Sequence, residues 1–119
     1  MFDWGSYLIF AKELVERRDE AAQRSAASRA YYAAFCKARN RLRQKGVIHK
    51  EDRIGHTRLW RIYRADPEFA TRRIGLNGDH MHEIRKEVDY EDTVVDLPYK
   101  VKLEIQMAEE LLEQLLSLP

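Results

Sequence analysis

No glycine or proline interrupts the chain between Glu20 and Lys45, and Gly46 follows as a helix stop. One long helix is therefore predicted. Its middle, AASRAYYAAFCKA, is apolar on nearly all sides, so neighbouring helices must cover most of its surface. The alanines allow those neighbours to approach closely, and the aromatic side chains fill the gaps between them. This segment constrains the rest of the chain to pack around it.

Apolar residues at helical spacing predict four further helices. Capping residues or a proline in the first turn mark where several of them begin. The predicted helices lie at residues 3–18, at His56–Arg64 after a loop at 47–55, at residues 66–90, and from Asp96 toward the end of the chain.

The helix predicted at residues 66–90 contains the sequence GLNG at Gly75–Gly78. Glycine weakens a helix, and Asn-Gly is also a turn signal. We expect one helix, bent at this point, and two shorter helices remain the alternative.

The amino-acid composition limits which class of protein the chain can belong to. With 119 residues, 45% of them hydrophobic and only three prolines and five glycines, the chain is expected to form one all-α domain over residues 1–119. The expected architecture is an up-and-down bundle of four main helices with an additional short helix. The sequence has no membrane-spanning run and no signal-peptide pattern, and its single cysteine, Cys36, is expected to be a buried packing residue. A cytoplasmic protein is therefore expected.

Charge is unevenly distributed although the net charge is only +1. Residues 17–64 hold fourteen Lys and Arg against four Asp and Glu, whereas residues 65–119 hold six against thirteen. A basic segment of this kind favours an anionic partner such as RNA, with Arg39 and Arg43 near the end of the long helix as candidate contacts. The alternative is that the segment pairs with the acidic end of its own chain or of a second copy.

Ser28 and Arg29 are polar insertions in the apolar part of the long helix. A buried arginine is costly unless it is paired. We therefore expect Arg29 to meet a carboxylate of another helix, or to point into a cleft or subunit interface where it could bind phosphate.

The stretch HMHEIRKEVDYED, from His80 to Asp92, carries the clearest candidate chemistry. His82, Arg85 and Asp89 are three and four residues apart, so they share one face of a helix. An arginine can hold a phosphate with two donors, a carboxylate can orient the arginine, and a nearby histidine can transfer a proton near neutral pH. A solvated helix face with ion pairs is the alternative interpretation.

Several kinds of site are not expected. The sequence contains no glycine-rich phosphate loop, CxxC, HExxH or GxSxG motif. His80 and His82 are two residues apart and diverge on a helix, so no metal and no cofactor are predicted. His56 is expected to pack at a helix entry rather than to take part in catalysis.

Two segments read together, RSAASRAYYAAFCKARNRL and EIRKEVDYED, resemble the small stand-alone HEPN domains (higher eukaryotes and prokaryotes nucleotide-binding) of bacteria and archaea. The matching positions are Ser28–Phe35, Gly55-His56 or Gly46 with His49, and Arg85 with Asp89 and Tyr90. The resemblance implies a helical bundle that forms a homodimer. Many such domains are metal-independent endoribonucleases, with an arginine followed four to six residues later by a histidine in a composite dimer site.

That resemblance assigns Arg85 to the scissile phosphate, but Tyr90 stands where the first allowed histidine would be, and no histidine follows within the motif. The expected function is an endoribonuclease toxin or defence component, with Asp89 and Tyr90 beside the arginine and His82 as a substitute for the histidine. In part of the family a minimal nucleotidyltransferase antitoxin modifies a tyrosine near the motif, which makes Tyr90 a candidate modification site. Its alternative role is a structural tyrosine at the helix end.

Two further functions stay open. The first is a catalytically inactive HEPN module that binds a nucleotide or a partner nucleotidyltransferase, which the missing histidine would explain. The second is a purely structural dimer in which Arg29 and Arg85 serve only internal ion pairs.

Overall fold

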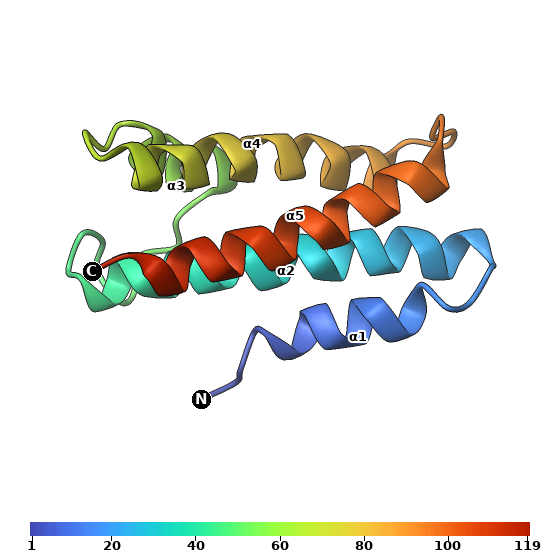
Figure 1. Ribbon diagram of the computed structural model, residues 1–119, viewed down its shortest axis with the longest axis horizontal. Coiled ribbons are helices and arrows are strands. Elements are labelled where there is room, and N and C mark those ends of the chain that lie inside the picture. The colour runs from blue at the N-terminus through green and yellow to red at the C-terminus, as the bar shows by residue number, and fades with distance from the viewer.

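The computed structural model describes residues 1–119 and contains five α-helices and no strand, so the all-α prediction is confirmed. In Figure 1, α1 and α4 run in one direction while α2 and α5 run in the other. None of the helices combines the length and apolar character needed to cross a membrane. The helices are α1 (Ser6–Leu14), α2 (Glu20–Gln44), α3 (His56–Arg64), α4 (Phe69–Tyr90) and α5 (Leu97–Ser117).

Helix α2 is the centre of the bundle and packs against each of the other four helices. Its buried side chains are mostly small, which lets those helices approach its backbone closely. Cys36 is among them, as predicted. The fully buried alanines are Ala26, Ala27, Ala30, Ala33, Ala34 and Ala38.

Helix α1 is shorter than predicted, covering Ser6–Leu14 rather than residues 3–18. The cause lies at the start of α2, where the Asp19 carboxylate accepts a hydrogen bond from the backbone N–H of Ala22 at 3.1 Å and caps the helix. The chain must turn just before this cap. Gln23 stabilises that turn, because its amide donates to the carbonyl oxygens of Val15 and Arg17 at 2.9 and 2.5 Å.

Helix α4 continues unbroken through the GLNG sequence, so the single-helix prediction is confirmed and the two-helix alternative is wrong. It begins at Phe69, slightly later than predicted. The glycines serve close packing instead of a turn. A Cβ atom on Gly75 would lie 2.6 Å from the backbone nitrogen of Arg64, and one on Gly78 would overlap the Trp60 ring, so only glycine lets α3 approach this closely.

Helix α5 buries a carboxyl group that the apolar pattern did not reveal. Glu104 is fully buried, and neither of its side-chain oxygens has a hydrogen-bond partner. Burial raises the pKa of this carboxyl well above its ordinary value near 4.5. Its spacing from Val101, Ile105 and Ala108, all buried, places it on the predicted core stripe of α5.

Replacing Gly78 by alanine tests the close packing of α3 on α4. The overlap with the Trp60 ring places the overpacking cost at the upper end of its usual range, about 3 kcal/mol, and the better helix propensity of alanine offsets about 1 kcal/mol. We therefore expect a net loss of about 2 kcal/mol in the free energy of unfolding. Urea denaturation measures it. Gly55→Ala is the matched control, because a Cβ there meets nothing within 4 Å, and it should cost less than about 1 kcal/mol. Equal effects of both changes would contradict this explanation.

Glu104→Gln tests the buried carboxyl. Below about pH 4.5 the group is protonated in both states, and its contribution to stability is complete. As the pH rises, the unfolded chain releases the proton first, so stability falls by up to about 1.4 kcal/mol per pH unit until the raised folded-state pKa is passed. Denaturation curves at several pH values should show this slope in the native chain and in Glu110→Gln, which alters an exposed residue of α5, but not in Glu104→Gln. If the free energy of unfolding changed with pH in parallel for all three proteins, the assignment of this slope to Glu104 would be refuted.

Candidate functional site

Arg85 of α4 lies between two tyrosine rings and is almost fully enclosed. Its guanidinium carbon stands 5.0 Å from the centre of the Tyr32 ring and 5.4 Å from that of Tyr90. Its Nη2 donates to the Tyr32 hydroxyl at 2.6 Å and more weakly to the Tyr90 hydroxyl at 3.4 Å. Only 11% of the arginine side chain is exposed, whereas Tyr90 is 70% exposed. Tyr90 therefore covers the arginine from the solvent side.

Asp89 and Ser28 complete this cluster. Arg85 Nε donates to Asp89 Oδ2 at 2.7 Å, which is the i, i+4 ion pair expected from their spacing. The Ser28 hydroxyl of α2 donates to the same carboxylate oxygen at 3.2 Å. Ser28 is thus the polar insertion that orients Asp89, and Asp89 in turn orients the arginine.

Arg24 holds the end of α4 beside this cluster. Its Nη1 donates to the carbonyl oxygens of Val88 and Glu91 at 3.1 and 2.6 Å, and its Nη2 donates to that of Asp92 at 3.0 Å. Carbonyl groups at the C-terminal end of a helix have no hydrogen-bond donor within the helix, so Arg24 supplies one. Arg24 was not among the residues predicted from the sequence. Its position one turn before Ser28, on the same face of α2, is the signal that could have identified it.

Two histidines from different helices meet next to Arg85. His56 begins α3 and His82 lies on α4, and their rings stack with centroids 4.8 Å apart and planes 12° apart. The ring of Tyr31 lies nearly parallel to His82 at 5.6 Å, and its hydroxyl is 2.7 Å from His56 Nδ1. His56 therefore belongs to the candidate site, although the sequence indicated only a packing role for it.

Both imidazoles are held in the neutral form. The pKa of His56 is lowered to about 4, mainly by burial and to a smaller extent by His82 and Arg85. Burial likewise lowers the pKa of His82, with the charges of Lys86 and Arg85 adding to the effect. A neutral imidazole can accept a proton through one nitrogen and donate a hydrogen bond through the other.

The other predicted phosphate-binding arginines lie away from this cluster. Arg29 packs over the Tyr7 ring of α1 at 5.0 Å, so the expected carboxylate partner is replaced by an aromatic face. Arg39 lies 5.5 Å from the centre of the Trp4 ring and donates to Asn40. Arg43 donates to the carbonyl oxygen of Asp52 at 2.9 Å. These three arginines thus contact α1, the residues before α1 and the 47–55 loop, respectively.

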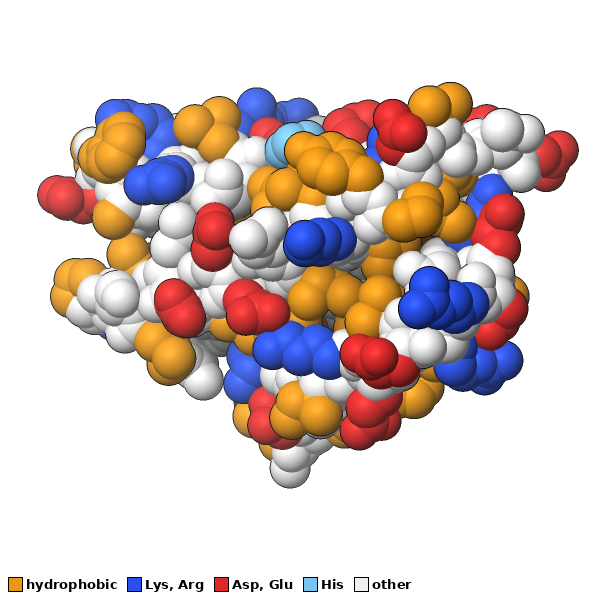
Figure 2. All heavy atoms as spheres, turned by 45° about the vertical axis from the view of Figure 1, so that its right-hand side comes forward, with side chains coloured by type: hydrophobic (Ala, Val, Ile, Leu, Met, Phe, Trp, Pro, Cys, Tyr) orange, Lys and Arg blue, Asp and Glu red, His pale blue; other side chains and the backbone are white.

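Basic and acidic side chains pair along the chain. Figure 2 shows Lys and Arg side chains next to Asp and Glu side chains across the face that it presents. Lys37 of the basic segment pairs with Asp3 at 2.9 Å, and Arg64 pairs with Asp79 at 2.8 Å. Part of the excess positive charge of residues 17–64 is therefore balanced within the chain itself.

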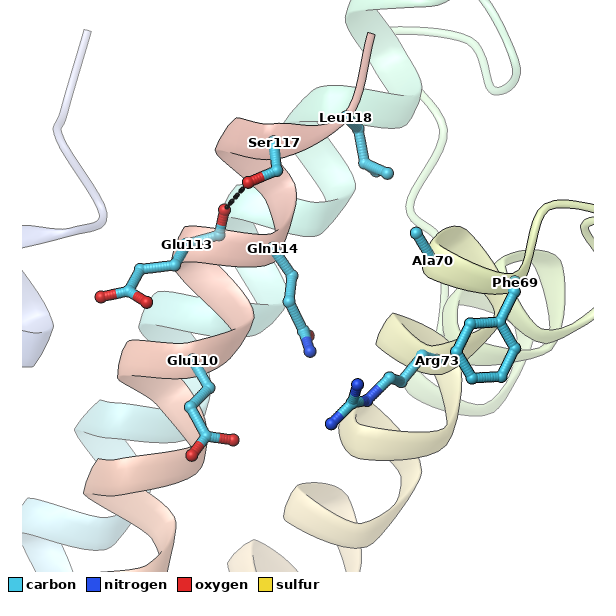
Figure 3. A pocket seen from close by; sticks show the side chains of 8 residues that line it. All are labelled: Phe69, Ala70, Arg73, Glu110, Glu113, Gln114, Ser117 and Leu118. Carbon is cyan, nitrogen blue, oxygen red and sulfur yellow. Dashed lines mark hydrogen bonds between the residues drawn. The ribbon is translucent and has the colours of Figure 1, made fainter.

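The two largest described hollows lie outside the Arg85 cluster. Figure 3 shows a hollow of about 470 Å³ between the start of α4 and the end of α5, with Arg73 reaching toward Gln114 and Glu110. A hollow of about 620 Å³ lies where the N-terminal residues meet α2 and α5. Neither includes His82 or Arg85, so these two hollows are not part of the candidate site.

Comparisons of the chain with protein-family models, with curated proteins and with solved structures find no match. No three His, Cys, Asp or Glu side chains are placed to hold a metal ion. A proposal of function therefore rests on the geometry of the Arg85 cluster and of the histidine pair.

The depressed pKa of His56 has a measurable consequence. In NMR titrations the ring signals of His56 should change around pH 4 in the folded protein and around pH 6.5 in urea. The unfolded chain binds the extra proton between these values, so this contribution to stability is present above about pH 6.5 and is lost as the pH falls toward 4. A His56→Asn protein should lack this component. Titration of His56 at the same pH in both states would contradict the burial argument.

Proposed function

We propose that this protein is a HEPN-like domain that acts as a homodimer and cleaves RNA without a metal ion, as a toxin or defence component. The observation that carries the proposal is the stack of two neutral imidazoles, His56 and His82, from two helices, close enough to Arg85 for its charge to lower the pKa of both rings. The arrangement of four helices of alternating direction with the short α3 beside them also agrees with an up-and-down bundle of this kind (Figure 1).

Metal-independent RNA cleavage needs a cation that holds the phosphate and a base that takes the proton of the ribose 2′-hydroxyl. Arg85 supplies the cation. His82 supplies the base, because its ring is neutral and lies one helical turn from the arginine on the same helix. Tyrosine is a poor base at neutral pH, so Tyr90 is assigned to hydrogen bonding with Arg85 and with the phosphate instead.

A second candidate is a catalytically inactive HEPN module that binds a nucleotide or a partner nucleotidyltransferase. The enclosure of Arg85 favours it, because Asp89 and Tyr32 already occupy two of its nitrogens and only 11% of its side chain is exposed. In this case Tyr90, which is exposed, would be the residue presented to the partner.

Incubation of the purified protein with tRNA or total RNA in EDTA tests the first proposal. The native chain should cleave RNA, and Arg85→Ala or His82→Ala should slow cleavage by about 100-fold or more. Arg73→Ala is the matched control, since it removes an exposed arginine of the same helix outside the cluster and should cleave normally. Sedimentation should show a dimer.

Equal cleavage by native and Arg85→Ala proteins would rule out this site as the source of the activity. An absence of cleavage with tight binding of a mononucleotide, or with co-purification of a nucleotidyltransferase, would favour the inactive module. A role limited to internal ion pairs would leave Arg85→Ala less stable, with neither activity nor ligand binding in the native chain.

A further inference from the structure

A chain of two hydrogen bonds connects α3, α2 and the candidate site. The indole nitrogen of Trp60 donates to the Tyr31 hydroxyl at 3.0 Å, and that hydroxyl lies 2.7 Å from Nδ1 of His56. Trp60 and Tyr31 are fully buried, so water does not compete for these groups.

The direction of each bond follows from the groups involved. An indole N–H can only donate, so the Tyr31 oxygen accepts from Trp60. The Tyr31 hydrogen then needs an acceptor, and His56 Nδ1 is the one within reach. If Nδ1 carried its own hydrogen, the buried Tyr31 hydroxyl would keep a donor with no partner, which folded proteins rarely tolerate.

The imidazole is therefore unprotonated at Nδ1. A neutral imidazole carries its single hydrogen on the other nitrogen, which here is Nε2. The low pKa of His56 agrees with a neutral ring. The ring stacks on His82 with centroids 4.8 Å apart and contacts the Phe35 ring at 4.2 Å with the planes tilted by 30°, so the orientation of the Nε2–H is restrained.

We infer that Tyr31, oriented by Trp60, is a positioning residue that holds His56 as its Nε2–H tautomer, so that His56 donates a hydrogen bond to the phosphate oxygen of a ligand at Arg85 and does not act as the base. The identity of that ligand rests on the proposed function. No bond forms or breaks at His56, and its hydrogen stays on Nε2. The task of accepting the 2′-hydroxyl proton then falls to His82, whose ring forms no hydrogen bond within the protein.

Long-range ¹H–¹⁵N correlation spectra of ¹⁵N-labelled protein report the tautomer of each histidine directly. In the native chain, His56 should show an unprotonated Nδ1 and a protonated Nε2 at neutral pH. Loss of its signals in His56→Asn assigns them. A protonated Nδ1 in the native chain would overturn the inference, and this result requires no other variant to fold.

Tyr31→Phe removes the hydroxyl and keeps the ring, so the stack should persist while the tautomer preference is lost. The expected result is a mixture of Nδ1–H and Nε2–H forms. Tyr63→Phe is the matched control, because it also removes a buried tyrosine hydroxyl, one that donates to the Ala38 carbonyl oxygen at 2.7 Å and touches no histidine. An unchanged His56 tautomer in Tyr31→Phe would overturn the positioning role.

Binding of a single-stranded RNA with 2′-O-methyl groups, which cannot be cleaved, tests the donor role. Tyr31→Phe should bind it about twofold more weakly than the native chain, because about half of the His56 rings would carry their hydrogen on the wrong nitrogen, and Tyr63→Phe should bind it as well as the native chain. Equal affinity of Tyr31→Phe and native protein would overturn the donor role of His56. No binding by the native chain would overturn the proposed function together with the donor role, whereas a wrong tautomer overturns the inference alone.

Discussion

The middle of helix α2 is apolar on nearly every side, and the other helices are arranged so that they bury this surface. Its alanines have small side chains, so α1, α4 and α5 can pack closely against it. Two adjacent tyrosines lie among these alanines and point about 100° apart around the helix. Tyr31 enters the core and binds the α3 residues Trp60 and His56, whereas Tyr32 meets Arg85 of α4. Burial of one helix therefore also sets the position of both halves of the candidate site.

The features that the sequence predicted well are those that depend on spacing within one helix. Periodicity of apolar residues identified four of the five helices, because burial on one face leaves a regular pattern whatever the partner is. The fifth, α2, was predicted from its long stretch without glycine or proline. The ion pair of Arg85 with Asp89 follows from the same geometry, since residues four apart on a helix are neighbours. The position of Arg85 at the centre of the charged stretch His80–Asp92 needed no knowledge of the other helices.

The features that could not be predicted from the sequence depend on which helices contact one another. The glycine at position 78 read as a turn signal because nothing local shows that the Trp60 ring needs its space. The position of Arg29 in an apolar helix suggested a carboxylate partner, whereas its guanidinium packs on the face of the Tyr7 ring. His56 joins the site only because α3 folds back along α4, which places it against a histidine distant in sequence. Burial of Glu104 without a partner contradicts the rule that charged residues mark exposed faces.

Access to Arg85 depends on which of its contacts is weakest. The hydrogen bonds to Asp89 and Tyr32 are 2.7 and 2.6 Å long, whereas the contact with the Tyr90 hydroxyl is 3.4 Å, and Nη1 has no partner. A phosphate oxygen at Nη1 and another in place of the Tyr90 hydroxyl at Nη2 would form a two-donor contact without breaking the ion pair with Asp89, and the displaced hydroxyl would then donate to the phosphate. Arg24 holds the backbone on both sides of Tyr90, so access to Arg85 would come through rotation of the exposed Tyr90 side chain. The enclosure of Arg85 is thus compatible with ligand binding, at the cost of one weak contact.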